Sequence, residues 1–375
     1  MEFTLDTLKK DEQVSLSLRK LYEQFGYKKY KVSKFEAYEL YLENKNFLKS
    51  EQIITFNDLD GKLLALKPDV TLSIIKNTNA NREQTEKLYY IENVYRLSRQ
   101  NHEYKEINQM GLEYIGDVDL YATLEVIQLA MDSLTAIDPN CILDISHMGF
   151  VSGLFDSLSV EHSVKMQLLG CLRSKNLHDL KRIVEQEHIS DFYRDKLEKI
   201  AALDGEFEST LQAAQELVIN DNMQDAVNEL KAIYQIISQN QLAQHIRLDF
   251  SIIQDIDYYN GIIFQGYVQK SPSAVLSGGR YDNLLKKFNR DAGAIGFALY
   301  LDELSRYYPV AMDYDVDTFV LYQNDADCNI LSQQIKKLVS SGERVRAGKQ
   351  IPADLRYKKL MKINGDILEE VDSRA

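Results

Sequence analysis

The sequence predicts an α+β fold, in which an antiparallel sheet is flanked by helices and interrupted by a helical insertion. Strand-like alternation comes first, helical spacing runs over about residues 163–241, and strand-like alternation then returns. A doubly wound sheet would alternate strands and helices throughout, so this order favours an antiparallel sheet. We expect a core over residues 1–312 with the insertion at about residues 150–243, and a small C-terminal α/β segment over residues 313–375.

Two amphipathic helices are predicted in the first half of the core. The first has apolar residues at steps of 4, 3 and 4 positions, namely Val14, Leu18, Leu21 and Phe25. Gly26 follows, and glycine commonly ends a helix because it takes the left-handed conformation without strain. The second helix follows Asp117 and Asp119, which are possible caps, and its apolar residues are Leu120, Leu124, Ile127, Met131 and Leu134.

Two β-hairpins are predicted between these helices. Residues 53–57 and 63–66 are short apolar runs, and the Asp-Gly step between them supplies the positive φ of a tight turn. Residues 88–97 and 104–116 are rich in β-branched and aromatic side chains and are joined by a polar loop, so they form a longer hairpin.

Strand patterns resume after the insertion. They cover residues 246–250, 262–268 and 274–276. In the C-terminal segment, a strand, a helix and a second strand are predicted at residues 318–322, 331–339 and 344–345. This order indicates a small βαβ domain.

The composition disfavours several classes of protein. Asp and Glu outnumber Lys and Arg by 57 to 44, and the formal charge of -13 opposes general attraction to a polyanion, although a local basic face stays possible. No run approaches the roughly 18 apolar residues of a membrane span, and the start lacks a secretion signal, so we expect a cytoplasmic protein without a membrane partner. The cysteines and histidines show no metal-ligand spacing, and no Gly-x-Ser-x-Gly elbow is present.

The longer hairpin carries a candidate amino-acid site. The period of two in its second strand places Gln109, Gly111 and Glu113 on one face, where the glycine leaves the backbone open to a ligand. On the partner strand, Arg96 shares a face with Glu92. A carboxylate and a guanidinium suit the ammonium and carboxylate groups of a free amino acid. A solvent-facing polar strand edge would show the same spacing, so both interpretations stay open.

Residues 277–282 read Ser-Gly-Gly-Arg-Tyr-Asp, which predicts a glycine turn at a strand end followed by the start of a helix. Such a turn can present backbone amides to an anion, or let a ligand approach the chain. It is not a phosphate loop, because neither the G-x-G-x-x-G spacing nor a following Lys-Ser or Lys-Thr is present. A bare turn is the other open interpretation.

Five motifs follow one another along the chain: Gly-Lys-Leu-Leu-Ala-Leu-Lys-Pro-Asp-Val-Thr at 61–71, Tyr-Tyr-Ile to Tyr-Arg at 89–96, Asn-Gln-Met-Gly-Leu-Glu at 108–113, Asp-Tyr-Tyr-Asn at 257–260 and Gly-Gly-Arg-Tyr-Asp at 278–282. Their order and separations resemble those of the histidyl-tRNA synthetase family over roughly residues 8–308. The resemblance implies a class II aminoacyl-tRNA synthetase-like core, an antiparallel sheet flanked by helices, with a helical insertion where the spacing predicts one.

The resemblance also implies a histidine site. Its residues would be Asp69, Thr71, Arg96, Gln109, Glu113, Tyr258, Tyr259 and Tyr281. Asp69 stands where the family has a glutamate for the ammonium group, and Arg96 stands at the family's motif 2 arginine. An acid and a tyrosine can pair both nitrogens of an imidazole ring. No catalytic residue, metal or cofactor is predicted for this chain.

Three positions depart from the family where the synthetases hold ATP. Ser98 stands where the family has a glutamate that contacts ATP, and Gln254 stands where it has an arginine used in adenylate formation. Glu303 stands where the family has an arginine that binds the triphosphate. The last change would place like charges together, which costs on the order of 4 kcal/mol at about 4 Å and an effective dielectric near 20. Ser33 also replaces the motif 1 proline, and the stretch after Pro309 is short for the family's anticodon-binding domain.

A retained histidine site beside a lost ATP site resembles the regulatory subunits of ATP phosphoribosyltransferase, the synthetase-like partners of a short-form catalytic subunit. The resemblance implies a subunit without catalysis of its own, required for the partner's activity and for histidine feedback inhibition in the first step of histidine biosynthesis. It also implies a dimer, a hetero-octamer with the catalytic subunit, and no tRNA binding. An active histidine–tRNA ligase and a free-standing histidine sensor are the open alternatives.

Overall fold

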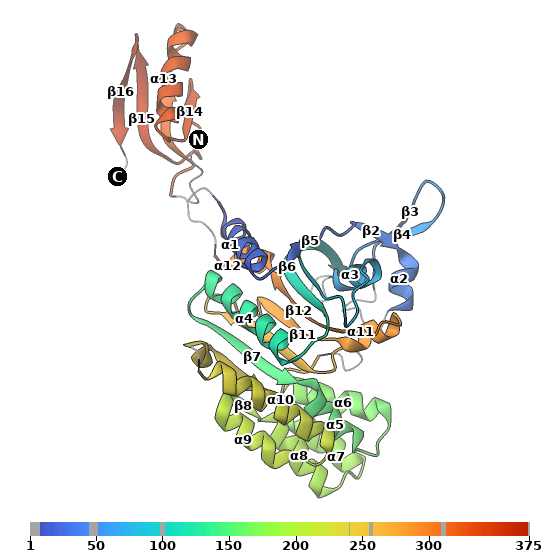
Figure 1. The fold of residues 1–375 in the computed structure, drawn as a ribbon. Coiled ribbons are helices and arrows are strands. Elements are labelled where there is room, and N and C mark those ends of the chain that lie inside the picture. The colour runs from blue at the N-terminus through green and yellow to red at the C-terminus, as the bar shows by residue number, and fades with distance from the viewer. Residues whose placement is uncertain are drawn as a thin grey trace. The chain divides into compact units, whose positions relative to one another are not determined.

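The computed structural model describes residues 8–44, 52–97, 102–239, 241–254, 258–308 and 313–373. The chain divides into two compact units, Met1–Pro309 and Val310–Ala375, where the sequence predicted a boundary after residue 312. The first unit holds a large sheet and the helical insertion, and the second holds a small sheet with one helix (Figure 1).

A nine-stranded sheet forms the centre of the first unit. Its strands are β1 (Lys28–Lys29), β5 (Glu86–Leu97), β6 (Tyr104–Gly116), β7 (Cys141–His147), β8 (Asp204–Glu206), β9 (Ile246–Asp249), β10 (Ile262–Val268), β11 (Leu276–Arg280) and β12 (Gly293–Tyr300). Their order is β1-β5-β6-β12-β11-β10-β7-β9-β8, and among the described strands β1 with β5 and β7 with β9 run parallel while the other neighbours are antiparallel. The predicted α+β fold and the long hairpin, β5 with β6, are confirmed.

The first predicted helix is α1 (Lys10–Gln24), which buries Leu18 and Tyr22 in the core. The Tyr22 ring packs edge-on against Phe297 of β12, with ring centroids 6.2 Å apart. Gly26 follows the helix with φ of +84°, so it takes the left-handed conformation expected at a helix end.

The second predicted helix is α4 (Leu120–Ile137), and the Asp119 carboxylate caps it by accepting a hydrogen bond from the Ala122 amide. Among the described residues, α4 is the one helix long and apolar enough to cross a membrane, contrary to the expectation that no such run exists. Most of its residues are buried, and it contacts β7, β10 and β12, which is the packing of a core helix.

A second, three-stranded sheet carries the shorter predicted hairpin. Its strands are β2 (Phe35–Ala37), β3 (Thr55–Asn57) and β4 (Leu63–Leu66), in the order β2-β4-β3. Gly61 supplies the predicted positive φ, at +78°, between β3 and β4. The short helices of this unit are α2 (Tyr38–Glu43), α3 (Thr71–Asn77), α11 (Asp282–Lys287) and α12 (Leu301–Tyr307).

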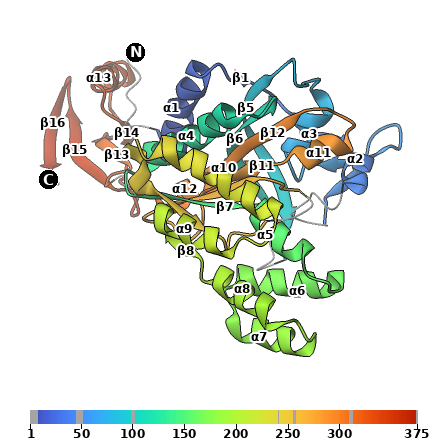
Figure 2. The same cartoon turned by 60° about the horizontal axis from the view of Figure 1, so that its bottom comes forward.

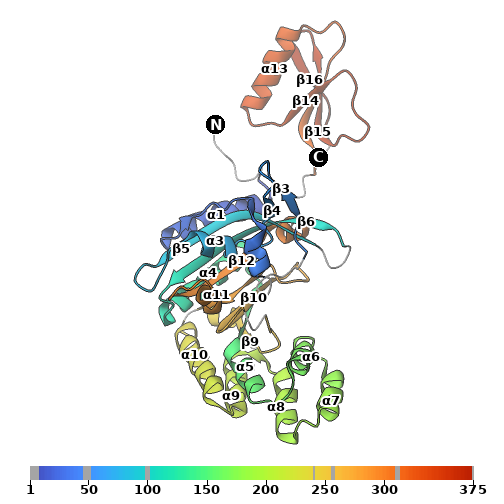
Figure 3. The same ribbon diagram turned by 90° about the vertical axis from the view of Figure 1, so that its right-hand side faces the viewer.

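The helical insertion is confirmed, and its helices lie on the side of the large sheet that carries β7 and β8 (Figure 2). They are α5 (Met148–Asp156), α6 (His162–Arg173), α7 (Leu177–Gln186), α8 (Asp191–Ala201), α9 (Phe207–Leu217) and α10 (Asp221–Ile237), followed by the 3-10 helix η3 (Gln241–His245). Figure 3 shows α6, α7 and α8 as a group beside α5. The helical spacing over about residues 163–241 did not predict β8, which lies within the insertion and pairs with β9.

The second unit is a four-stranded sheet with one helix. Its elements are β13 (Val316–Leu321), α13 (Cys328–Ser340), β14 (Val345–Gly348), β15 (Tyr357–Asn364) and β16 (Ile367–Ser373). β13 and β14 run parallel around α13, which confirms the predicted βαβ order. The antiparallel pair β15 and β16 was not predicted.

Candidate functional site

One cavity of about 990 Å³ brings together all eight residues that the sequence predicted for a binding site. They are Asp69, Thr71, Arg96, Gln109, Glu113, Tyr258, Tyr259 and Tyr281. These residues come from the start of α3, from the β5–β6 hairpin, and from the chain beside β10 and β11. The fold therefore builds one site from motifs that are far apart in the sequence.

Glu113 is the buried acid of this cavity, with 2% of its surface exposed. Thr71 Oγ1 donates a hydrogen bond of 2.7 Å to Oε1, and the Tyr281 hydroxyl donates to Oε2. Burial, opposed by the two hydroxyl donors and aided by the charge of Asp69, raises the pKa of Glu113 to about 8. The Glu113 carboxyl group therefore exchanges its proton near neutral pH, and it can donate or accept a hydrogen bond with a ligand.

Two glycines of the sheet leave room for this arrangement. Gly296 of β12 lies opposite Glu113, and a Cβ there would overlap Glu113 Oε2 and the carbonyl oxygen of Leu112. Gly111 lies opposite Tyr90, and a Cβ there would overlap its phenol group. The predicted approach of a ligand to the backbone at Gly111 is wrong, because Tyr90 of the neighbouring strand fills that space.

Asp69 and Arg96 place opposite charges side by side in the cavity wall. Asp69 Oδ1 accepts a hydrogen bond of 2.9 Å from the Leu72 amide, and its Oδ2 lies 3.7 Å from Arg96 Nη2. Arg96 is held in turn by a hydrogen bond of 2.7 Å from its Nε to the Pro68 carbonyl oxygen. The pair is complementary to a zwitterion, whose ammonium and carboxylate groups each find a partner of opposite sign.

Three tyrosines form an aromatic cluster on the cavity wall. The ring centroid of Tyr258 lies 4.5 Å from that of Tyr259 and 5.5 Å from that of Tyr281. Burial raises the pKa of all three hydroxyl groups, and the nearby carboxylates raise it further. The hydroxyls therefore stay neutral, and each can both donate and accept a hydrogen bond.

Residues of β12 and α6 complete the cavity, and the sequence did not predict them. Tyr300 of β12 lies opposite Gln109 in register and lines the cavity. One face of α6 adds His162, Met166, Leu169 and Arg173. Their spacing of 4, 3 and 4 positions is visible in the sequence. It also fits any core-facing helix, and only the fold places this face over a cavity.

A buried ion pair holds the segment that carries Asp69 and Thr71. Lys67 Nζ lies 2.6 Å from Glu92 Oε2, and the Lys67 side chain is 1% exposed. The Lys67 carbonyl oxygen also accepts a hydrogen bond of 3.0 Å from the Tyr95 amide. The pair therefore attaches the segment before α3 to β5, and the sequence analysis did not find it.

The three departures from the synthetase pattern have different outcomes. Gln254 lines the cavity, whereas Ser98 and the motif residue Asp257 lie outside the described residues. Glu303 lies on α12 and is not among the described residues that line the cavity. Its carboxylate accepts a hydrogen bond of 3.3 Å from Ser273 Oγ. The repulsion of a triphosphate by Glu303 therefore stays a prediction.

The predicted glycine turn is wrong as well. Gly278 and Gly279 lie within β11, paired with β10 on one side and β12 on the other. A Cβ on Gly278 would overlap the Gly296 carbonyl oxygen, so close strand packing explains this glycine. α11 begins at Asp282, as predicted.

No metal site accompanies the cavity in the part of the chain that the structure describes. There, no group of three or more His, Cys, Asp or Glu side chains is placed to hold a metal ion.

The family model for histidyl-tRNA synthetase matches residues 2–304 of the chain. An ATP phosphoribosyltransferase regulatory subunit from Clostridium kluyveri is 31% identical over 301 residues, which cover 78% of this chain and 77% of the relative. A histidine–tRNA ligase from Methanocaldococcus jannaschii is 26% identical over 366 residues, 96% of this chain and 86% of the relative.

Solved structures share the fold. A Bacillus halodurans protein described as an ATP phosphoribosyltransferase regulatory subunit/histidyl-tRNA synthetase has a TM-score of 0.76 and 24% identity, covering 94% of this chain and 93% of its own. An ATP phosphoribosyl transferase (HisG:HisZ) complex from Thermotoga maritima contains a chain with a TM-score of 0.61 and 19% identity, covering 80% of this chain and 98% of its own. Because the sequence match to the regulatory subunits extends over most of both chains and reaches 31% identity, this chain belongs to the synthetase-like family of ATP phosphoribosyltransferase regulatory subunits.

Proposed function

We propose that this chain binds free histidine in the cavity and thereby regulates a separate, short-form ATP phosphoribosyltransferase subunit in the first step of histidine biosynthesis. The observation that carries the proposal is the meeting of the eight predicted residues in one cavity. Membership of the regulatory-subunit family supports the role, and a cytoplasmic location fits it.

Each group of histidine has a candidate partner in the cavity. The ammonium group would lie against Asp69 and the carboxylate against Arg96, which stand next to each other. The imidazole ring carries one donor and one acceptor in its neutral form, and Glu113 with Tyr281 offers both functions. Gln109, which is 3% exposed, adds a buried amide to the same wall.

Regulation would follow from linkage between two binding events. If histidine binds one arrangement of the complex more tightly, it shifts the population toward that arrangement, and a differential affinity of about 1 to 3 kcal/mol suffices. The complex described for the Thermotoga maritima protein supports a catalytic partner chain. We infer a dimer of this chain within a hetero-octamer.

The proposal also assigns no catalysis to this chain itself. Gln254 is a neutral amide in the cavity wall, where the synthetases have an arginine for adenylate formation. A neutral amide supplies no positive charge to a developing phosphate charge, so adenylate formation would lose an electrostatic contribution. The chain would also not bind tRNA.

Calorimetric titration of the purified chain with histidine, ATP and tRNA in parallel tests the binding claim. We expect heat from histidine alone. Mixing the chain with the short catalytic subunit should restore phosphoribosyl transfer to ATP, and histidine should inhibit the mixture. A catalytic subunit that is fully active and histidine-sensitive without this chain would contradict the regulatory role.

An active histidine–tRNA ligase is the second candidate, because the match to the Methanocaldococcus jannaschii enzyme covers 96% of this chain. Histidine-dependent exchange of pyrophosphate into ATP distinguishes the two, since only the ligase would show it. A free-standing histidine sensor would bind histidine but would not capture the catalytic subunit in a pull-down.

A further inference from the structure

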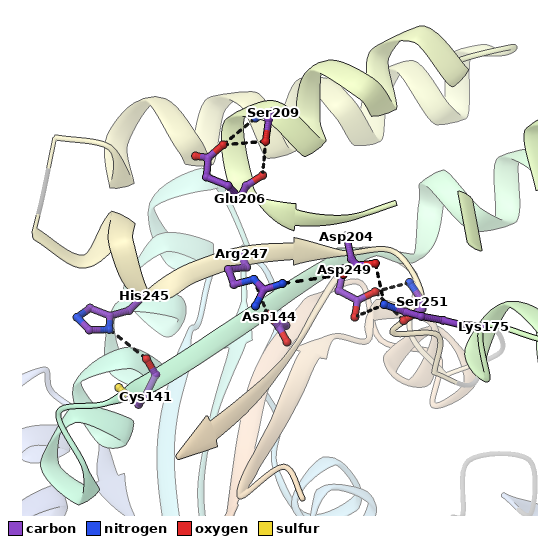
Figure 4. A network of polar contacts seen from close by, with 10 residues as sticks. All are labelled: Cys141, Asp144, Lys175, Asp204, Glu206, Ser209, His245, Arg247, Asp249 and Ser251. Carbon is purple, nitrogen blue, oxygen red and sulfur yellow. Dashed lines mark hydrogen bonds and ion pairs between the residues drawn. The ribbon is translucent and has the colours of Figure 1, made fainter. Parts of the chain in front are cut away.

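Lys175 joins the insertion to the large sheet through two carboxylates. It lies between α6 and α7, and its Nζ is 2.8 Å from Asp204 Oδ1 and 3.4 Å from Asp249 Oδ2 (Figure 4). Asp204 belongs to β8 and Asp249 to β9, so one ammonium group connects a helix turn to the edge of the sheet.

The ammonium group of Lys175 offsets the repulsion between the two carboxylates. Asp204 and Asp249 are register partners on adjacent antiparallel strands, where like charges directly opposite each other are destabilising. Arg247 is the other nearby cation, and its Nη2 lies 3.9 Å from Asp204 Oδ2. Lys175 is therefore the closer of the two cations, and it is the one that also reaches Asp249.

Asp249 connects Lys175 to the cavity wall. Its Oδ1 accepts hydrogen bonds of 2.9 Å from the Ser251 amide and of 2.6 Å from Ser251 Oγ (Figure 4). Asp249, Ser251 and Gln254 all line the cavity. One carboxylate oxygen thus faces Lys175, while the other binds Ser251 in the wall segment 251–254.

The backbone of Lys175 is in the left-handed conformation. Its φ is +51°, in the left-handed region, and it follows the last turn of α6. Glycine or asparagine is preferred at such a position, and other residues are strained there. The two ion pairs of its ammonium group are contacts that glycine or asparagine could not make.

We propose that Lys175 is a positioning residue of the cavity, which holds Asp249 and the wall segment 251–254 in the arrangement that binds the ligand. The contact also holds the end of α6, whose face from His162 to Arg173 covers the cavity. This inference rests on the proposed function only for the identity of the ligand, histidine.

Four variants of the full chain test the proposal by calorimetry with histidine. Lys175→Met removes the charge and should weaken histidine binding about fivefold, the effect of a partly exposed ion pair. Lys175→Arg should restore most of the affinity. Asp204→Asn should keep the affinity within about twofold, because Lys175 can still hold Asp249. Lys199→Met breaks an exposed pair with Asp195 on α8 and should not change the affinity appreciably.

A ligand-free measurement separates this inference from the proposed function. Hydrogen exchange of the amides of residues 251–254 should be faster in Lys175→Met than in wild type, and unchanged in Asp204→Asn and Lys199→Met. If wild type gives no heat with histidine, the proposed ligand is wrong, while faster exchange in Lys175→Met alone still supports positioning. Unchanged exchange in Lys175→Met, or an equal loss of affinity in Asp204→Asn, overturns the inference.

Discussion

Thr71 and Glu113 are joined by a hydrogen bond of 2.7 Å, from the hydroxyl at the start of α3 to the buried carboxyl group of β6. The Tyr281 hydroxyl reaches the second oxygen of the same carboxyl group from the end of β11. Three of the five sequence motifs therefore meet at one side chain. The charge and shape of Glu113 should accordingly control both the stability of the core and the binding of a ligand.

The stability of the protein should fall as the pH rises towards 8. The pKa of Glu113 is raised from 4.5 to about 8 in the folded protein, so between these values the folded state binds more protons than the unfolded state. The free energy of unfolding then decreases with pH, by at most about 1.4 kcal/mol per pH unit. Urea unfolding at pH 5, 6, 7 and 8 checks this slope against Glu113→Gln, in which this contribution is absent. Parallel slopes in the two proteins would contradict the assignment to Glu113.

Gly296→Ala should destabilise the core and weaken histidine binding. The added methyl group would overlap Glu113 Oε2, and overpacking of this kind costs about 1 to 3 kcal/mol. Gly170→Ala is the matched control, because a Cβ at Gly170 of α6 meets nothing within 4 Å. In that helix, alanine should stabilise by up to about 1 kcal/mol. Thermal unfolding and histidine titration of both variants give the comparison, and an unchanged Gly296→Ala protein would refute it.

Tyr259→Phe should weaken histidine binding about threefold to tenfold with little change in stability. The substitution removes one hydroxyl from the cavity and keeps the ring that packs on Tyr258. Tyr121→Phe, at a residue 67% exposed on α4, serves as the control. Equal affinities of the two variants would place the Tyr259 hydroxyl outside the ligand contacts.

Lys67→Met should destabilise the protein by about 3 kcal/mol, because it leaves Glu92 without its buried cation. The double variant Lys67→Met/Glu92→Gln should regain part of this loss, since no uncompensated charge remains. Lys76→Met breaks a more exposed pair with Glu36 and should cost about 1 kcal/mol or less. Urea unfolding of the three proteins measures these differences. A double variant that is less stable than Lys67→Met would argue against charge burial as the cause.

Much of the site was predictable because its residues sit in motifs whose order is visible in the sequence. The period of two in β6 correctly places Gln109 and Glu113 on one face, and both line the cavity. The same period could not show what lies above Gly111, because Tyr90 reaches that space from another strand. Contacts between strands depend on register, which a single strand pattern does not contain.

The direction of the Glu303 side chain does not follow from its motif alone. Gly296, Phe297, Ala298 and Tyr300 of β12 line the cavity, but α12 begins at Leu301. At that point the period changes from 2 to 3.6, so the direction of residue 303 does not follow from the strand before it.

The missed strands have plain physical causes. β8 consists of Asp204, Gly205 and Glu206, residue types that are depleted in strands, so only its pairing with β9 makes it one. β11 contains Gly278 and Gly279, which a single sequence presents as a turn. In the fold, the neighbouring strands leave no space for larger residues there.

β8 also limits how this protein can be shortened. Although it belongs to the insertion, it is the outermost strand beside β9. A variant that lacks the insertion would leave β9 as an unpaired edge strand. Its exposed amide and carbonyl groups could then pair with a second copy of the chain. The truncated protein should aggregate during expression unless another strand covers this edge.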